Sequence, residues 1–489
     1  MIKCILKRLL KEHREECYRC LSIGKMKFKM YSSKYAFRQL QEDISRLDQR
    51  YDDLNSQHRQ LVSQYVHLQV CYENLRQNIP ELINCSHRRQ TDWLSKIQKE
   101  QDRQSAEVQC LIKAQLPNAY THLSAFSKVG NAGDNLLVPA LRDSIQKISG
   151  HPMVWCHKSV RNALDAETVE LINATRGLVI GGGGLFLRDT NRNDISGWQW
   201  ACSLNELDKI QVPMYMLGVG YNRFRGQEEF EPYFKAHINE IVRRFSFVGL
   251  RNHGSVRAIR QYVSDGLKGK VCYHPCATTV LSKIYQLPDR REEKVIALNC
   301  AFDRSGMRYG AHKEERLCAI AKILKQYEES YTIKYYVHMS SDKEMLPFLD
   351  AADLKYEVVE LDQGLTVDGF LKAYCAPTLV LAMRGHAQMI PFGCGTPVLS
   401  IISHDKLKWF LEDIGHLEWG VEIQDKQFEQ NLSSIMGYML SHIKQIKAEM
   451  QAAQDRLWEI TQTNIKRIFE CDQEMKNNDN SIYPGKGRE

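Results

Sequence analysis

The chain has 489 residues, of which 43% are hydrophobic and 26% charged, a composition typical of a globular protein with two or three domains. Ten Lys or Arg and three Glu within residues 1–34 account for the whole net charge of +7, so a broad nucleic-acid-binding surface on the folded domains is not expected. No apolar run is long enough to cross a bilayer, the amino terminus is too charged for a secretory signal, and the fifteen cysteines lack regular spacing, which together predict a cytoplasmic protein.

Residues 1–34 combine their positive charge with apolar residues such as Ile5 and Leu9. One interpretation is a basic amphipathic helix that lies on an anionic membrane surface, which would give a cytoplasmic protein peripheral membrane contact. The other is a solvated extension of the helix that follows. The sequence leaves both interpretations open.

Residues 35–112 are predicted to form a helical stalk. The leucines Leu40, Leu47, Leu54, Leu61, Leu68 and Leu75 recur every seven residues, and the second seam position holds Phe37, Ile44, Tyr51, His58, Tyr65 and Tyr72. This repeat predicts self-association through residues 37–75 as a left-handed coiled coil, with the number and direction of its strands undetermined. A long helix packed on its own domain is the alternative.

From residue 115 onward, short apolar runs alternate with helical patterns, which predicts parallel α/β sheets. We expect two Rossmann-like domains, at residues 115–287 and 292–424, with a ligand cleft between them. Strands are expected at residues 153–156, 177–180, 214–218, 245–249 and 269–273, and then at 295–299, 332–338, 356–361, 379–383 and 397–401. Residues 425–472 are predicted to be amphipathic helices, and the polar residues 473–489 a disordered tail.

A glycine run follows the apolar stretch at residues 178–180. Because Gly182, Gly183 and Gly184 lack Cβ, their backbone N–H groups could approach an anion closely, and a helix starting beyond them would add a favourable dipole. The spacing fits neither a Walker loop nor the dinucleotide fingerprint. A tight strand-to-helix turn is the alternative.

The apolar run at residues 378–383 ends in Arg384 and His386, and a small-residue turn precedes the next apolar run. Buried parallel strands deliver such side chains to their carboxyl ends, where α/β sheets bind ligands. Arg384 can hold a phosphate or carboxylate through two hydrogen bonds, and His386 can exchange a proton near neutral pH. The pair predicts chemistry on a small anion, and a helix-capping network is the alternative.

Other polar residues are placed at similar turns. Asn131 and Asp134 precede an apolar helix. Arg251 stands at a strand end, with Ser255 placed to cap the following helix. Lys406 follows the strand after the Arg384 turn, where it could meet an anion or form a surface salt bridge.

In chain order, these segments resemble the polysaccharide pyruvyl transferase family. The matching motifs are an early Gly-Asp turn, a Val-Ile-Gly-Gly-Gly strand, a Leu-Gly-Val-Gly strand, a Leu-Arg-x-x-x-Ser segment and a Met-Arg-x-His turn continued by Gly-Thr-Pro-Val, with a lysine shortly after. The stalk and tail lie outside the family's core, and Gly385 stands where the family usually carries a bulkier residue. The resemblance implies a GT-B arrangement of two Rossmann-like domains. It also implies phosphoenolpyruvate as donor, a glycan as acceptor, a pyruvate ketal as product, and neither a cofactor nor a metal ion.

By this resemblance, Arg251 and Arg384 bind the anionic groups of the donor. Phosphoenolpyruvate carries a phosphate and a carboxylate, which call for at least two cationic groups. Protonation of its methylene carbon requires a general acid, for which His386 is the candidate. Asp134 is the candidate to orient or deprotonate the acceptor hydroxyl, and Lys406 to neutralise phosphate.

Two other functions fit the sequence. A nucleotide-sugar glycosyltransferase could use the same two-domain scaffold, and a coiled-coil scaffold or sensor could retain a degenerate ligand site. If the enzyme acts on a lipid-linked glycan, the tail and stalk would gather several catalytic domains at a membrane surface.

Overall fold

The computed structural model describes residue 64 and residues 66–71, 116–126, 130–289 and 294–482. The chain divides into two units, Met1–Gln115 and Leu116–Glu489. In the first unit the described residues are helical. The basic tail at 1–34 and nearly all of the stalk at 35–112 lie outside the described residues, so the coiled coil and the membrane contact remain predictions.

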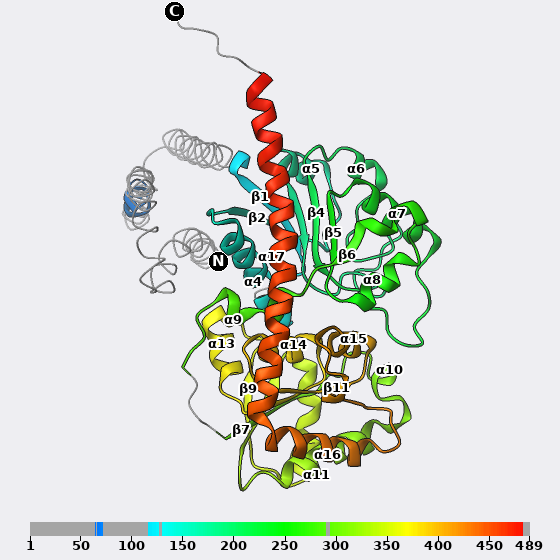
Figure 1. Cartoon of the computed structure of the whole chain (residues 1–489), viewed down its shortest axis with the longest axis vertical. Helices are drawn as coiled ribbons and strands as arrows, with labels where there is room; N and C mark the ends of the chain where they lie inside the picture. The colour runs from blue at the N-terminus through cyan, green and yellow to red at the C-terminus, as the bar shows by residue number, and fades with distance from the viewer. Residues whose placement is uncertain (1–63, 65, 72–115, 127–129, 290–293, 483–489) are drawn as a thin grey trace, which may run out of the picture. The chain divides into compact units, whose positions relative to one another are not determined.

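The second unit begins with a six-stranded parallel sheet in the order β2-β1-β3-β4-β5-β6 (Figure 1). Its strands are β1 (Ala119–Ser124), β2 (Val154–Ser159), β3 (Leu178–Gly181), β4 (Met214–Val219), β5 (Phe247–Leu250) and β6 (Val271–Tyr273). Every residue of β1, β3, β4 and β5 is buried, as expected for parallel strands covered on both faces.

The helices of this first domain connect successive strands. They are α4 (Ala132–Ser149), α5 (Ala166–Asn173), α6 (Leu204–Asp208), α7 (Pro232–Arg244), α8 (His253–Arg260) and α9 (Leu281–Ile284), with short 3-10 turns η1 (Leu116–Asn118), η2 (Asp265–Lys270) and η3 (Ala277–Thr279). Helix α4 begins where the Asn131 side chain accepts the N–H of Gly133, and it ends at Gly150, whose φ of 72° glycine adopts readily.

A second six-stranded parallel sheet follows in the order β12-β11-β10-β7-β8-β9, with its first strand in the middle, as in a Rossmann fold. Its strands are β7 (Val295–Asn299), β8 (Thr332–Val337), β9 (Tyr356–Glu360), β10 (Leu379–Ala382), β11 (Val398–Ile402) and β12 (Gly420–Glu422). Its helices are α10 (Ser305–Tyr309), α11 (Lys313–Lys325), α12 (Leu346–Ala351), α13 (Val367–Cys375), α14 (Gly385–Gly393), α15 (Asp405–Ile414) and α16 (Phe428–Ser441), with the 3-10 turns η4 (Gly310–His312), η5 (Ser340–Met345) and η6 (Leu417–Trp419). The predicted fold class, two Rossmann-like domains in a GT-B arrangement, is confirmed.

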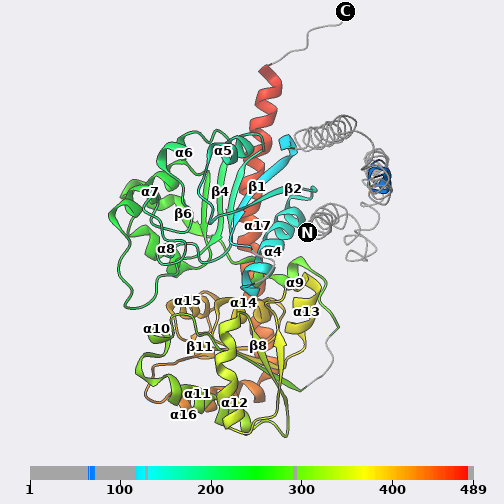
Figure 2. The ribbon, with the colours of Figure 1, turned by 180° about the vertical axis from the view of Figure 1, so that it is seen from behind.

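The last helix, α17 (Ile443–Ile482), runs from the second domain back along the first, as Figure 2 shows from behind. Its Asn464 donates to the carbonyl of Tyr273 in β6 over 2.9 Å, and its Arg456 donates to the carbonyl of Ile414 at the end of α15 over 3.1 Å. The helix continues past residue 473, so the disordered tail predicted from there is wrong up to Ile482. Extending an existing helix adds a backbone hydrogen bond per residue without a new nucleation step, which the polar composition alone does not reveal.

Each predicted strand overlaps an observed one, but β1 and β12 were not predicted. Strand β1 carries Thr121, His122 and Ser124 at buried positions, and these polar residues hide the apolar pattern. They are satisfied internally: His122 hydrogen-bonds the carbonyl of Gly181 at the end of β3 over 3.2 Å. None of the helices in the described residues is both long and apolar enough to span a bilayer.

Glycines bring the two domains into close contact. A Cβ added to Gly254 in α8 would lie 2.0 Å from the Trp409 ring in α15, and one added to Gly393 in α14 would lie 2.0 Å from the backbone oxygen of Thr278 in η3. Because the oxygen of Thr278 belongs to the backbone, it could move away from such a Cβ only if the chain around it moved as well. The carboxyl ends of strands from both sheets therefore meet at one junction.

Candidate active site

Four of the predicted site residues, Asp134, Arg251, His386 and Lys406, meet at this junction. Asp134 and Arg251 belong to the first domain, and His386 and Lys406 belong to the second. The charges of Arg251 and Lys406 both act on Asp134 and on His386. Residues more than 270 positions apart in the chain are thus joined in one electrostatic cluster.

Asp134 faces His386 across the domain boundary. Its carboxylate lies in the first turn of α4, where Oδ2 accepts a hydrogen bond of 2.9 Å from Asn131 Nδ2. Its Oδ1 lies 4.0 Å from Nδ1 of His386. Burial raises the pKa of Asp134, although Arg161, Arg251 and Lys406 oppose the shift. A carboxylate with a raised pKa beside an imidazole is suited to proton transfer.

Gly133 allows this approach. A Cβ on Gly133 would lie 2.2 Å from Nδ1 and 2.5 Å from Cβ of His386. We expect Gly133→Ala to destabilise the protein by about 1–3 kcal/mol through overpacking. It should also lower turnover by about 100-fold, since a displacement near 1 Å can cost that much. Urea unfolding and steady-state kinetics would measure both effects.

Gly266→Ala is the matched control, because no heavy atom lies within 4 Å of the added Cβ. That variant should unfold and turn over like the wild type. If Gly133→Ala behaves in the same way as the control, close approach of α4 to His386 is not required.

His386 lies in the first turn of α14, a helix whose residues are all buried. The small-residue turn predicted after Arg384 is therefore wrong, because glycines and alanine here permit close helix packing rather than a turn. Nε2 of His386 lies 3.9 Å from Sγ of Cys276, a buried free thiol. Burial, Arg251 and Lys406 hold the pKa of His386 well below its usual value. These surroundings therefore favour the neutral form of the imidazole.

Arg251 is a buried cation that forms no ion pair with the described residues. It follows β5, and its Nε and Nη2 have no hydrogen-bond partner. Its guanidinium lies against Gly220, where an added Cβ would be 2.1 Å from Nε. Burial lowers the pKa of Arg251, while Cys276 and Asp134 raise it. Buried unpaired charges are costly, so such a group indicates a place for an anion.

Lys406 is a second cation without a carboxylate partner. It lies in the first turn of α15, and Nζ donates a hydrogen bond of 2.7 Å to Oδ1 of Asn222. In the described part of the chain, no carboxylate lies within the 4.0 Å of an ion pair to Nζ. Burial, Arg308 and Arg251 hold its pKa well below the ordinary value. The predicted surface salt bridge for Lys406 is therefore not formed.

Gly385 lies beside this lysine. A Cβ at Gly385 would touch the Lys406 side chain at 3.6 Å from Cε. Gly385, which departs from the family pattern, therefore packs against the aliphatic part of the Lys406 side chain.

Arg384, in contrast, is fully paired. Its Nε donates to both carboxylate oxygens of Asp342 over 3.0 and 2.9 Å, its Nη2 also contacts Asp342, and its Nη1 donates to Asp303 over 2.8 Å. Asp342 is completely buried. The structure therefore places Arg384 against two carboxylates rather than at an anion-binding position.

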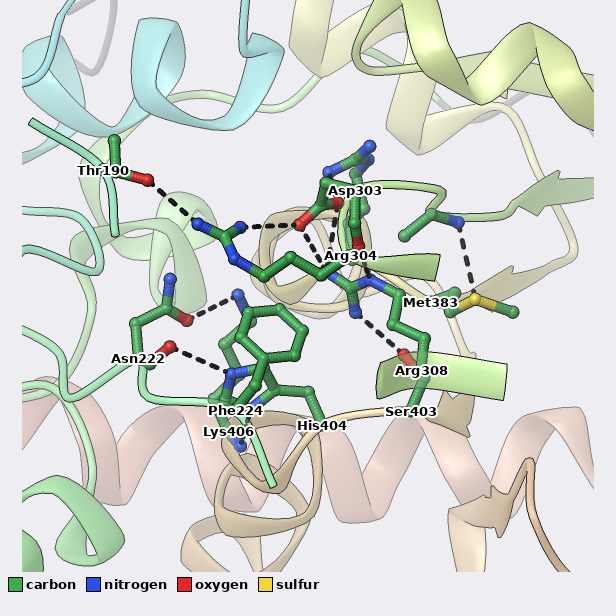
Figure 3. Close-up of polar contacts among 12 residues, drawn as sticks. Thr190, Asn222, Phe224, Asp303, Arg304, Arg308, Met383, Ser403, His404 and Lys406 are labelled. Atoms are coloured by element: carbon green, nitrogen blue, oxygen red, sulfur yellow. Dashed lines mark hydrogen bonds and ion pairs between the residues drawn. The ribbon is translucent and has the colours of Figure 1, made fainter. Parts of the chain in front are cut away.

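Asp303 also pairs with other arginines, as the close-up in Figure 3 shows. Arg308 donates to its carboxylate over 2.9 and 3.1 Å, and Arg304 does so over 3.3 Å. Burial favours a higher pKa for Asp303, but Arg308 and Arg384 together bring it well below its usual value. Asp303 and Asp342 were not predicted as site residues, although both follow the carboxyl ends of strands, β7 and β8, where functional residues gather.

Phe224 covers this charged group from the first domain (Figure 3). The guanidinium carbons of Arg304 and Arg308 lie 5.0 and 4.9 Å from its ring centroid, and Nζ of Lys406 lies 6.0 Å away. Cation–π contacts of this kind stabilise cations that are withdrawn from water.

The glycine loop packs closely at the same junction. Gly182 and Gly183 have φ of 76° and 90°, and Gly182 donates its N–H to the carbonyl of Leu217 in β4 over 3.0 Å. A Cβ on Gly184 would lie 2.8 Å from Cγ of Asn222. The next helix in the chain is α6 at Leu204, so the helix start expected directly after the glycines is absent from the described residues. An irregular loop replaces it because Phe186 bridges to Tyr221 as a continuation of the sheet.

Ser255 forms hydrogen bonds with two residues near the site. Its hydroxyl accepts the N–H of Tyr221 over 2.9 Å, and its own N–H donates to Oδ1 of Asn252 over 2.6 Å. The cap of α8 is therefore Asn252, and the predicted cap at Ser255 is wrong, because an asparagine three residues earlier already satisfies the helix end.

Among the described residues, no three His, Cys, Asp or Glu side chains gather so as to hold a metal ion.

A sequence model of the polysaccharide pyruvyl transferase family matches residues 131–405, which is more than half of the chain. No curated protein sequence matches this chain.

Solved structures that match include a proposed UDP-N-acetylglucosamine 2-epimerase from Listeria monocytogenes, a glycosyltransferase from Rickettsia africae, and Anabaena Alr3699/HepE in complex with UDP and glucose. Their TM-scores are 0.46, 0.45 and 0.45, and their sequence identities are 13%, 11% and 12%. The matches cover 74%, 74% and 73% of this chain, and 97%, 100% and 99% of the respective structures. At this level of similarity, the neighbours say nothing about the reaction of this chain.

Proposed function

Because the chain belongs to the polysaccharide pyruvyl transferase family, we propose that it transfers pyruvate from phosphoenolpyruvate to a glycan and forms a pyruvate ketal. One observation carries this proposal. Within the described ranges, Arg251 and Lys406 form no ion pair with a carboxylate, and both act on the same imidazole and carboxylate. A donor with two anionic groups fits such a site.

Arg251 and Lys406 serve as the two cationic groups for the donor. A guanidinium can hold a phosphate or carboxylate through paired hydrogen bonds, and an ammonium supplies a compact second charge. Arg384, which the family resemblance implies as an anion ligand, is occupied by Asp342 and Asp303. We therefore assign Arg384 to holding the second domain's carboxylates in place.

His386 is the proposed general acid. A bound anion beside it stabilises the imidazolium, so the pKa of His386 rises when the donor binds. The imidazolium gives its proton to the methylene carbon of phosphoenolpyruvate, and the adjacent carbon becomes an oxocarbenium-like centre. The electron pair of the carbon–carbon double bond forms the new carbon–hydrogen bond.

Asp134 is the proposed base for the acceptor. A sugar hydroxyl attacks the electron-poor carbon and loses its proton to the Asp134 carboxylate. Phosphate then leaves with the electrons of its carbon–oxygen bond, and a second hydroxyl of the same sugar closes the ketal as its proton passes to the now neutral imidazole of His386. The raised pKa of Asp134 makes it a stronger base than an ordinary carboxylate.

Binding of phosphoenolpyruvate should be accompanied by proton uptake. The pKa values of His386 and Lys406 are lowered in the free protein, and an anion raises both, so each group gains protons on binding at a pH between its free and bound values. Affinity should accordingly fall as pH rises through this range. Calorimetry in two buffers with different ionisation enthalpies would measure the uptake, and proton release on binding would contradict the expectation.

Thermal unfolding of the full chain tests the choice of donor. A ligand that binds only the folded state raises the midpoint as its concentration increases. We expect a shift with phosphoenolpyruvate and none with a panel of nucleotide sugars. A shift with a nucleotide sugar alone would favour glycosyl transfer, and no shift with either would favour a scaffold with a degenerate site.

The acceptor is proposed to be a glycan or a lipid-linked glycan in the cytoplasm. Neither a cofactor nor a metal ion is required by the proposed steps. Self-association through residues 37–75 and membrane contact through residues 1–34 would bring catalytic domains together at a lipid-linked acceptor. Sedimentation with anionic and neutral liposomes would test the membrane contact.

A further inference from the structure

Asn222 links the two domains at the site. It follows the Gly-x-Gly end of β4, and its backbone N–H donates to the carbonyl of Phe186 over 2.9 Å. Its side-chain Oδ1 accepts the hydrogen bond of 2.7 Å from Lys406, and its backbone carbonyl lies 3.3 Å from Nε2 of His404 (Figure 3). Sheet hydrogen bonding in the first domain therefore fixes the group that receives the lysine of the second.

Lys406 donates to the amide of Asn222, whereas the nearby arginines of the second domain donate to carboxylates. Arg308 and Arg384 donate to Asp303, and Arg304 donates to Asp189 over 2.7 Å. Each of these guanidinium groups is thereby neutralised by a carboxylate. Lys406 instead receives one neutral oxygen, which orients an ammonium without cancelling its charge.

We propose that Asn222 is a positioning residue that aims Lys406 at the anion site and keeps its positive charge available for the ligand. The proposal rests on the proposed function only in that the ligand is an anion. An aspartate at this position would have nearly the same shape, but it would neutralise Lys406 before any ligand arrived. The neutral amide thus determines whether the junction attracts phosphate.

The surroundings of Lys406 make its charge sensitive to this one partner. Burial and nearby cations destabilise the ammonium, and Asp303 stabilises it from a greater distance than an ion pair. The charged and titratable groups that interact with it are Arg308, Arg251, Asp303, Arg384, His404, Asp134 and His386. A carboxylate at position 222 would therefore keep Lys406 protonated to higher pH while occupying it.

Binding of inorganic phosphate and of phosphoenolpyruvate to the full chain, measured by calorimetry across pH, tests the proposal. Asn222→Asp should weaken both affinities by at least about tenfold, because the ligand must displace a charged partner. It should also move the loss of the Lys406 charge to higher pH. Asn222→Ala removes the orienting group but adds no charge, so affinity should fall by about threefold, clearly less than in Asn222→Asp.

Asn205→Asp is the matched control, since it adds the same charge at an exposed position in α6 and should not change affinity. Thermal unfolding of each variant verifies that it is folded. Equal phosphate affinity for Asn222→Asp and wild type would overturn the proposal, as would an equal loss in Asn222→Ala and Asn222→Asp.

The phosphate measurement separates this inference from the proposed function. If wild type binds phosphate and Asn222→Asp does not, the role of Asn222 stands even when phosphoenolpyruvate proves not to be the donor. If wild type binds neither anion, both the anion site and the role of Asn222 are wrong.

Discussion

Replacing Arg251 with methionine is expected to weaken phosphoenolpyruvate binding by about 100-fold while leaving the fold intact. The guanidinium is buried, and two of its nitrogens have no hydrogen-bond partner among the described residues. Its removal therefore breaks no existing hydrogen bond to those atoms and removes an unpaired buried charge. The free energy of unfolding should stay within about 1 kcal/mol of wild type or increase.

Calorimetry with phosphoenolpyruvate and urea unfolding would measure the two effects on the same preparation. Arg243→Met serves as the control, because Arg243 is exposed in α7 and pairs with Glu240 one turn away. That variant should bind the donor like wild type. Undiminished affinity in Arg251→Met would show that the unpaired guanidinium is not an anion ligand.

Replacing Arg384 with methionine should lower stability strongly and donor affinity only slightly. Its removal leaves Asp342, which is completely buried, and Asp303 without a shared cationic partner. Breaking a buried ion pair in this way costs about 3–5 kcal/mol, so the urea midpoint should fall sharply. Donor affinity, measured where the variant is still folded, should change less than in Arg251→Met.

A second substitution provides the control for Arg384. Asp342→Asn in the Arg384→Met background removes the stranded charge and should restore part of the lost stability. If Arg384→Met instead unfolds like wild type and loses donor binding, then Arg384 is the direct anion ligand that the family resemblance implies, and the assignment to Lys406 is wrong.

The arrangement of the two domains could be predicted from sequence because buried parallel strands leave continuous apolar runs. Strand β1 was not predicted, because His122 and Thr121 are buried polar residues that interrupt the apolar run. Their hydrogen-bond partners lie far along the chain. The site could be predicted in part for a related reason. Asp134, Arg251, His386 and Lys406 all stand at strand or helix ends, and the topology brings these ends together.

The pairing of charges within the site could not be predicted in the same way. Arg384 meets Asp303 and Asp342, which lie 81 and 42 residues before it, and no local pattern connects them. Arg251 looked equivalent to Arg384 in the sequence, yet it has no carboxylate partner. The difference depends on which strand ends are neighbours in space, and this decides which arginine is free for a ligand.

Asn222 was missed because an amide after a Gly-x-Gly strand end is not a chemical signal by itself. Its significance arises only when Lys406, 184 residues later, is seen to donate to it. The glycines gave a stronger signal but for a different reason than expected. Their small size permits close packing between the domains, as Gly133 shows against His386.

Direct detection of the product is the measurement that tests the central claim. The full chain would be incubated with 13C-labelled phosphoenolpyruvate and a mixture of glycans, and mass spectrometry would follow the label while a phosphate assay follows the leaving group. We expect labelled pyruvate to appear on a glycan as a ketal, together with equimolar phosphate, and Arg251→Met to abolish both. Transfer of a sugar from a nucleotide sugar to the same mixture, with phosphoenolpyruvate left unchanged, would contradict pyruvyl transfer.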